Sequence, residues 1–358
     1  DGILQEKLVL PRKVHEAVVS RIKILAELKI DERRLPQDGR FSFRADDQEV
    51  DLRVSSLPTV DGEKIVMRLL RKTSNVPTLG ELGLRGMALK VIEESIKVPH
   101  GIVLITGPTG SGKTTTLYSV LHILNTSRVN IVTLEDPVEY QIDGVNQVQI
   151  NVKAGLSFAT GLRSFLRQDP NIIMVGEIRD NETADLAIQA SLTGHLVFST
   201  LHTNSSSGAL PRLLDMNAEP FLLASSMTCV AAQRVLRKIC DNCRETYAPP
   251  AQALDEMKKV LGPLYDAFVS QLAGKPVMLS RGRKCEKCGD TGYKGRIAIF
   301  EVLKVTEKIG KLILERAPAI QIEQAAVIDG MVLMEQDGYL KALEGITTLE
   351  EVMRVAKT

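Results

Sequence analysis

The chain carries a run of glycines and hydroxyl residues that ends in a lysine and two threonines. It reads Gly107-Pro108-Thr109-Gly110-Ser111-Gly112-Lys113-Thr114-Thr115 and matches the G-x-x-x-x-G-K-[ST] pattern of phosphate-binding loops. An apolar strand-like segment precedes the run and a helix-like segment follows it, which is the setting that such a loop requires. Glycines let backbone N–H groups close around phosphates, Lys113 reaches the β and γ oxygens, and Thr114 offers its hydroxyl to Mg²⁺. The run therefore predicts a site for ATP and Mg²⁺.

An acidic residue follows a second apolar segment, residues 172–175. Gly176 and Glu177 come directly after that segment. A strand of this kind usually ends in an aspartate that holds Mg²⁺. Because Gly176 stands in its place, that carboxylate is missing and Glu177 is left to polarise the attacking water. We expect other acids to help with the metal.

Three acids, Glu135, Asp136 and Glu139, are the candidates that we expect beside the metal. They lie in the run TLEDPVEY, residues 133–140, at the end of another strand-like segment. Open α/β sheets bind their ligands at this edge, where the carboxyl ends of the strands meet. Solvated acids without a role are the alternative for both glutamates.

Two histidines flank one more apolar strand. His195 and His202 lie in the run TGHLVFSTLHTN and are seven residues apart, an odd step that places them on opposite faces of a regular strand. We therefore expect them to do different jobs. His202, at the carboxyl end, is the better candidate for sensing the γ-phosphate, and a structural role is the alternative for each.

Four of the five cysteines form two C-x-x-C pairs, Cys240 with Cys243 and Cys285 with Cys288. Two thiolate pairs with this internal spacing suit tetrahedral Zn²⁺. The gap between the pairs is longer than in common zinc ribbons, which predicts an insertion closed at its base by a structural metal. A redox role is the alternative. The fifth, Cys229, lies in an apolar stretch that we interpret as helical, where it is most simply a buried small side chain.

Arg53 and Arg68 alternate with apolar residues in two strand-like segments near the start of the chain. They are therefore expected on the sheet face away from the apolar side chains. Periodicity alone favours a solvated face for both, as it does for Arg40 and Arg44.

The segments that must position these residues show two patterns. Residues 1–72 combine one amphipathic helix with strands of period two, which predicts a small α+β domain. Residues 73–82 break both periods and are expected to form a linker. In residues 83–358 short apolar strands alternate with helical stretches, which predicts an α/β domain with a parallel sheet. Within it we expect the zinc-binding insertion at 240–288 and a helical region at 306–358.

The composition is that of an ordinary globular protein. The 358 residues include 45 Lys and Arg against 44 Asp and Glu, and 44% are hydrophobic, which excludes disordered and collagen-like chains. The nearly neutral charge disfavours a nucleic-acid binder that works by bulk positive charge. No segment approaches the about 20 apolar residues that cross a bilayer. Because the chain begins at Asp1, we expect an upstream part to be missing.

Four of the runs described above, in their order along the chain, resemble motifs of the secretion NTPase family. This family includes type II secretion ATPases and type IV pilus assembly ATPases. The matching runs look like its Walker A, Asp box, Walker B and His box, at 107–115, 135–139, 176–180 and 194–204. The family normally has glycine before the Walker B glutamate, so Gly176 supports the match. The resemblance implies a RecA-like P-loop NTPase core with a small PAS-like α+β domain and a zinc-clamped insertion.

The resemblance also implies how the protein works. It implies a homohexameric ATPase motor with ATP, Mg²⁺ and Zn²⁺, in which Arg53 and Arg68 match arginine fingers. Its work would be the assembly of pilin or pseudopilin subunits, with an inner-membrane platform protein and the pilus or secretion machinery. The location would be cytoplasmic, peripheral at the inner membrane. The resemblance also implies an upstream docking domain, which we expect to belong to the missing start of the chain.

The cysteine quartet looks like that of the assembly and secretion branch, whereas pilus retraction ATPases lack it. Two other functions remain open. One is a RecA-like nucleic-acid translocase, with the basic run around Arg281 and Arg283 as a candidate phosphate contact. The other is a nucleotide-controlled scaffold with negligible turnover, which the presence of Glu177 disfavours.

Overall fold

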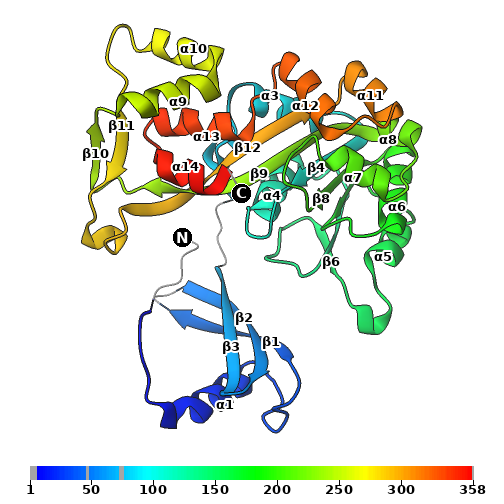
Figure 1. Cartoon of the computed structure of the whole chain (residues 1–358). Helices are drawn as coiled ribbons and strands as arrows, with labels where there is room; N and C mark the ends of the chain where they lie inside the picture. Colours follow the sequence, from blue (N-terminus) through cyan, green and yellow to red (C-terminus); the bar gives the residue numbers. More distant parts are fainter. Residues whose placement is uncertain (1–5, 46–47, 72–75, 357–358) are drawn as a thin grey trace. The chain divides into compact units, whose positions relative to one another are not determined.

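The computed structural model describes residues 6–45, 48–71 and 76–356, and the chain divides into two compact units (Figure 1). Of these described residues, the smaller unit comprises those up to 76 together with 139–141, and the larger unit comprises 77–138 and 142–356.

Part of the segment expected to be a linker, residues 73–82, is helical. Residues 73–75 lie outside the described part of the chain, whereas α2 (Leu79–Leu82) is a short helix of the larger unit. A capping box starts it, because the Glu81 N–H donates to Thr78 Oγ1 at 3.2 Å and the Thr78 N–H donates to Glu81 at 2.8 Å. A threonine followed three residues later by glutamate is a recognisable helix start, so the sequence contained this signal.

The smaller unit is a three-stranded antiparallel sheet with one α-helix. The helix is α1 (His15–Leu25), preceded by the 3-10 turn η1 (Arg12–Val14), and the strands are β1 (Gln37–Ala45), β2 (Gln48–Thr59) and β3 (Gly62–Arg71), in the order β1-β2-β3. Leu52 and Val54 are buried as their alternation predicts. Lys23 of α1 is also buried, and its ammonium lies 2.8 Å from a carboxylate oxygen of Glu63 on β3. This ion pair ties the helix to the sheet.

Seven strands form the sheet of the larger unit. They are β4 (Gly101–Thr106), β5 (Ile131–Glu135), β6 (Asn146–Gln149), β7 (Ile172–Val175), β8 (Leu196–Leu201), β9 (Met227–Ile239) and β12 (Tyr293–Lys304). Their order is β12-β9-β4-β8-β7-β5-β6, and neighbours are parallel except for the pair of β9 and β12. The α/β fold with a largely parallel sheet is confirmed. The chemistry-bearing runs follow the carboxyl ends of the adjacent strands β4, β8, β7 and β5.

Cys229 corrects one expectation, because it lies in strand β9 and not in a helix. Its side chain is fully buried, as expected. The stretch from Cys229 to Ala232 is buried on both faces of the sheet, so it reads as a continuous apolar run without alternation. A short run of this kind cannot be told from a buried helix by periodicity.

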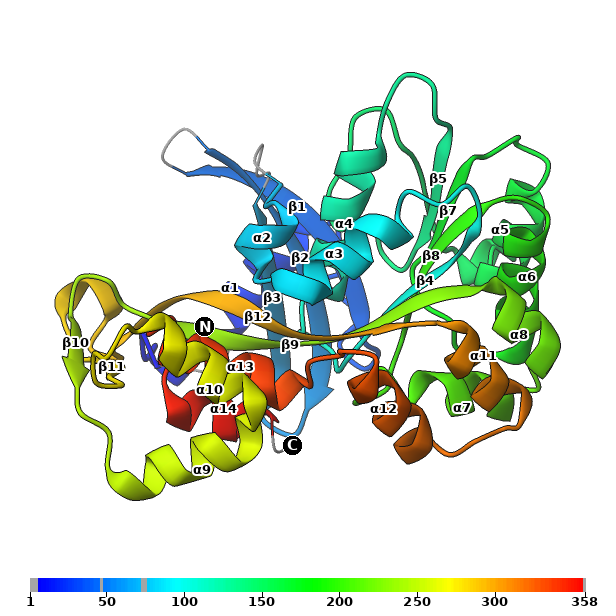
Figure 2. The ribbon, with the colours of Figure 1, turned by 90° about the horizontal axis from the view of Figure 1, so that it is seen from above.

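Two groups of helices cover the sheet of the larger unit. The first group packs on it in one core cluster and comprises α5 (Phe158–Phe165), α6 (Asn181–Leu192), α7 (Ala209–Asp215), α8 (Pro220–Ser226), α11 (Glu307–Leu314) and α12 (Ala319–Ile328). A second cluster joins β9 and β12 to α9 (Ala251–Leu261), α13 (Met334–Leu343) and α14 (Leu349–Ala356). Figure 2 shows the two groups at opposite ends of the long strands β9 and β12.

Residues 240–288 contain a small module of their own. Strands β10 (Arg244–Tyr247) and β11 (Leu279–Gly282) form an antiparallel pair, and α9 and α10 (Pro263–Gln271) lie between them in the chain. The 3-10 turn η3 (Glu286–Cys288) follows β11. Helices α3 (Gly86–Ser95) and α4 (Lys113–Leu124) complete the larger unit, with the 3-10 turn η2 (Val152–Ala154).

Candidate nucleotide site and metal centre

The loop between β4 and α4 has the backbone of a phosphate cradle. Gly107 and Gly112 have positive φ, 145° and 86°, which a side chain would disfavour. A Cβ on Gly107 would also lie 2.4 Å from the Gln233 carbonyl oxygen, so nothing larger fits there. A Cβ on Gly110 would meet nothing within 4 Å. The loop is therefore closed toward the protein and open on its other side, where α4 begins.

Side chains of the loop fit a bound phosphate. Ser111 is buried, and its Oγ has no hydrogen-bond partner among the described residues. Lys113 donates from Nζ to the carbonyl oxygens of Gly107, at 2.8 Å, and Pro108, at 3.2 Å. Partial burial lowers the pKa of Lys113, and the nearby carboxylate of Glu177 opposes that shift. An orphaned hydroxyl, a lysine and a helix N-terminus together suit a phosphate group.

Glu177 is fixed at the carboxyl end of β7 by its neighbours in the chain. The Gly176 N–H donates to the Leu134 carbonyl oxygen at 2.8 Å, and the Ile178 N–H donates to the Thr200 carbonyl oxygen at 3.0 Å. A Cβ on Gly176 would lie only 3.1 Å from that same Leu134 oxygen. A side chain at this position would therefore need the β5 backbone to shift by a few tenths of an ångström.

The carboxylate of Glu177 contacts two donors of the larger unit. One oxygen forms an ion pair with the Arg179 guanidinium, and the other lies 3.3 Å from His202 Nε2. The guanidinium also lies 3.9 Å from Asp136 Oδ2. Its hydrogen bond with Glu177 raises the pKa of Arg179. The structure thus brings Glu177 and His202 together, and Arg179 and Asp136 lie beside them.

A signal for Arg179 existed in the sequence. It stands two residues after Glu177, and side chains two apart in an extended segment lie on the same side. Asp136 belongs to the acidic run expected at this edge of the sheet, but only the pairing of β5 with β7 places it beside the Arg179 guanidinium.

His195 lies at the amino end of β8, away from this group. Its Nδ1 is 2.7 Å from the Ala190 carbonyl oxygen and 3.2 Å from Thr193 Oγ1. Both contacts are to the end of the preceding helix α6. They favour the structural alternative for this histidine.

Glu135 is a buried carboxylate surrounded by donors. It is 3% exposed and accepts hydrogen bonds from Thr133 Oγ1 at 2.6 Å, from Gln147 Nε2 at 3.1 Å and from the Tyr118 hydroxyl. Such a carboxylate is held in one orientation on the side of the sheet next to α4. Glu139 is grouped with the smaller unit, and its place among the acids beside the metal stays a prediction.

Arg53 and Arg68 lie directly opposite each other on β2 and β3, and Arg40 of β1 is opposite Arg53. Directly opposed residues share one face of a sheet. Like charges in this position repel each other, and a bound anion would relieve that repulsion. The row is therefore a surface suited to phosphate, and the assignment of Arg53 and Arg68 as arginine fingers stays a prediction.

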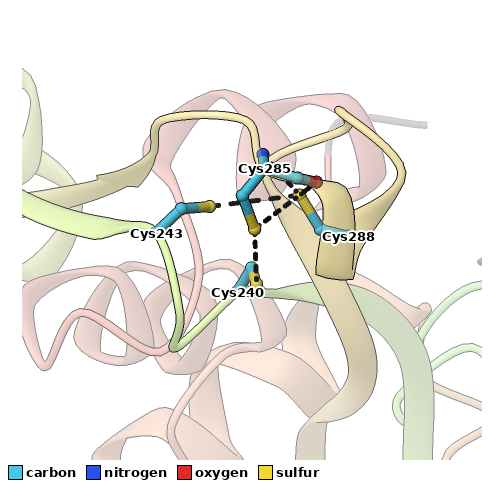
Figure 3. Close-up of side chains that lie close together, drawn as sticks. All are labelled: Cys240, Cys243, Cys285 and Cys288. Carbon is cyan, nitrogen blue, oxygen red and sulfur yellow. Dashed lines mark hydrogen bonds between the residues drawn. The ribbon is translucent and has the colours of Figure 1, made fainter.

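The four paired cysteines converge (Figure 3), and their sulfur atoms all lie within 4.8 Å of one another. Sγ of Cys285 is 3.9 Å from that of Cys240 and 3.6 Å from that of Cys288, which is 4.0 Å from that of Cys243. Tetrahedral Zn²⁺ with Zn–S bonds of 2.3 Å separates its sulfur ligands by about 3.8 Å. The donor set fits structural zinc.

Backbone groups favour thiolates in this cluster. The N–H groups of Cys285 and Gly292 donate to Cys288 Sγ at 3.2 and 3.3 Å. Burial raises the pKa of Cys288, but these hydrogen bonds outweigh it and lower the pKa to about 6. Burial and the neighbouring thiols raise the pKa of Cys243 to about 12. A bound cation would deprotonate such a thiol.

The type II/IV secretion system protein family matches residues 1–354. The chain belongs to this family. It is 48% identical over 357 residues to the type II secretion system protein E of Pseudomonas aeruginosa, covering 100% of this chain and 68% of that protein. It is also 48% identical over 353 residues to the type IV pilus assembly ATPase PilB of Thermus thermophilus, covering 99% of this chain and 39% of that protein.

A solved structure of the pilus retraction motor PilT with bound ADP is similar as well, with a TM-score of 0.62 and 27% identity over 90% of this chain and 77% of that one. The predictions of the family and of a secretion or pilus ATPase are confirmed. A nucleic-acid translocase is not favoured. Among the helices that the structure describes, none has the length and apolarity to cross a membrane.

Proposed function

We propose that this member of the family is a hexameric motor that hydrolyses ATP to assemble pilin or pseudopilin subunits. The observation that carries the proposal is the convergence of the phosphate loop and the Glu177 group at one edge of the sheet. Lys113, which is near Glu177, begins the helix that follows β4, and His202 follows β8. Phosphate binding and water activation are thereby brought into one place.

In the proposed reaction Glu177 orients the attacking water and His202 holds its carboxylate. Lys113 and the backbone N–H groups of the loop stabilise charge on the β and γ phosphates. Mg²⁺, held by Thr114, would supply further neutralisation of that charge when bound. Glu135, fixed by its three donors, would help to hold that metal ion.

Arg53 and Arg68 are proposed to stabilise the transition state as arginine fingers. Their support is the cross-strand row on the smaller unit and the resemblance of their segments to the family pattern. An arginine finger contributes about 10³ to 10⁵ in rate. Within a hexameric ring, movement of the smaller unit as phosphate leaves would be the power stroke.

The cysteine quartet supports the assembly and secretion branch over retraction. The proposed location is cytoplasmic, peripheral at the inner membrane, through a platform protein and the pilus or secretion machinery. The similarity to secretion protein E and to PilB supports these partners.

Steady-state phosphate release with ATP and Mg²⁺ tests the proposal, with and without single-stranded DNA. Glu177→Gln serves as the blank, because it keeps the shape but loses the carboxylate. Glu94→Gln is the matched control, since Glu94 lies on α3 and pairs with Lys304 outside the site. Turnover that disappears only in Glu177→Gln and ignores DNA is expected.

Two results would contradict the motor. A many-fold increase of phosphate release with single-stranded DNA would indicate a translocase. Tight ATP binding without phosphate release at any protein concentration would indicate the scaffold.

A further inference from the structure

Glu177 has little open surface left for water. Its side chain is 15% exposed, and both carboxylate oxygens contact the chain itself, one at Arg179 and one at His202. The Arg179 side chain is 59% exposed, so the guanidinium is the more open partner of the pair. A cation bonded to a carboxylate also competes with any further donor to it. Water orientation by Glu177 is therefore opposed by its contact with Arg179.

The guanidinium has a second carboxylate within reach. Asp136 Oδ2 lies 3.9 Å from one of its terminal nitrogens, at the carboxyl end of the neighbouring strand β5. Asp136 is itself 42% exposed, so it can accept a closer contact. A small rotation of the Arg179 side chain would exchange one carboxylate for the other.

Only the side chain of Arg179 is free to make this exchange. The residue before it, Ile178, is buried and its N–H donates to the Thr200 carbonyl oxygen at 3.0 Å. The residue after it, Asp180, caps helix α6 by accepting from the Thr183 N–H at 2.8 Å. The backbone on both sides is thus anchored, and the contact can switch without rearranging the sheet.

Lys113 is likewise paired with groups of the chain itself. Its ammonium is bonded to two carbonyl oxygens of the phosphate loop. The lysine and the Glu177 carboxylate are therefore both paired with groups of the chain itself. A partly exposed ion pair shifts an equilibrium by no more than about fivefold, so its effect would be to slow turnover and not to stop it.

We propose that Arg179 is a resting clamp on Glu177 and that Asp136 receives the guanidinium when the clamp opens. The inference rests on the proposed function, in which Glu177 orients the attacking water. Opening the clamp precedes each turnover, so its cost appears in kcat and not in the affinity for ATP. Asp136 lowers that cost and acts only through Arg179.

Four proteins test the clamp by steady-state phosphate release over a range of ATP concentrations. Arg179→Gln is expected to raise kcat about two- to fivefold with KM unchanged. Asp136→Asn is expected to lower kcat by a similar factor, because the guanidinium loses its second partner. In the double variant kcat is expected to equal that of Arg179→Gln alone. Arg128→Gln is the control, since this exposed arginine precedes β5 and lies at the opposite end of the strands.

A merely structural role would lower kcat in both single variants, and the two losses would add. The clamp is overturned if kcat of Arg179→Gln is equal to or below that of the unchanged protein. This includes the result that neither protein releases phosphate. It is also overturned if Asp136→Asn still lowers kcat when Arg179 is absent. Failure of the proposed function is distinct, because there Glu177→Gln would turn over like the unchanged protein. Binding of a fluorescent ATP analogue confirms that each variant is folded.

Discussion

Glu177 and His202 meet across the carboxyl ends of two neighbouring strands, with a carboxylate oxygen 3.3 Å from the imidazole Nε2. The parallel pairing of β7 with β8, which sets Val175 opposite Ser199, brings them together. In the proposed reaction the histidine therefore holds the carboxylate of Glu177, in addition to any contact with phosphate.

His202→Ala is expected to lower kcat about 10- to 100-fold, since the Glu177 carboxylate loses the imidazole that lies 3.3 Å from it. KM for ATP should change little, because the phosphate loop is untouched. Phosphate release at saturating ATP measures the effect. His195→Ala is the control, as His195 is bonded to α6 at the other end of the strand. Equal losses in both variants would refute a specific role for His202.

Arg53→Ala is expected to reduce kcat at least about 10³-fold while leaving ATP binding measurable. The loss should exceed that of Lys64→Ala, a change of an exposed lysine on the same face of β3 as Arg68. Single-turnover phosphate release and binding of a fluorescent ATP analogue separate the two steps. Unchanged turnover in Arg53→Ala would show that Arg53 is not an arginine finger.

Removal of zinc is expected to lower the thermal unfolding midpoint by at least about 5 °C, because metal binding contributes directly to folding. The quartet joins Cys240, directly after β9, to Cys285, after β11. Cys285→Ser should reduce bound zinc below one ion per chain by elemental analysis, whereas Cys229→Ala should not. A chelator without effect on the unfolding midpoint would argue against a structural metal.

The contacts of Glu351 predict that the folded protein loses stability in acid. Its buried carboxylate accepts a hydrogen bond from the Arg237 N–H at 3.0 Å and pairs with the guanidinium at 2.8 Å, and it also pairs with Arg354. Burial raises the pKa of Glu351, but the hydrogen bonds from Arg354 and Arg237 outweigh it and lower the pKa to about 2. A carboxyl whose pKa is lower in the folded state stabilises the fold above its ordinary pKa of 4.5.

That stabilisation is lost as the pH falls from 4.5 toward 2. The unfolding midpoint of the unchanged protein should therefore drop more steeply through this range than that of Glu351→Gln, and the two should converge near pH 2. Thermal unfolding followed by circular dichroism at stepped pH values measures the difference. Parallel curves would show that Glu351 is not the group responsible.

Local sequence determined the parts of this protein whose physics is local. The phosphate loop needs glycines at fixed spacing within one short segment and a strand before it, so residues 107–115 predict both the geometry and the ligand. The two C-x-x-C pairs likewise predict their convergence, because each pair forms one half of a metal site by itself. Period two in the first 72 residues predicts the small sheet, and hence that Arg53 and Arg68 lie on the face away from the apolar side chains.

Only the tertiary structure decided which distant groups share a contact. Strand order places β5 and β8 on either side of β7, so Asp136 and His202 reach the group around Glu177 from opposite directions. It also buries Glu135 among donors from α4, β5 and β6. The position of β9 between β12 and β4 made Cys229 part of a strand whose apolar run suits a helix equally well. Pairing between strands joins residues far apart in the chain, and neither residue type nor spacing encodes it.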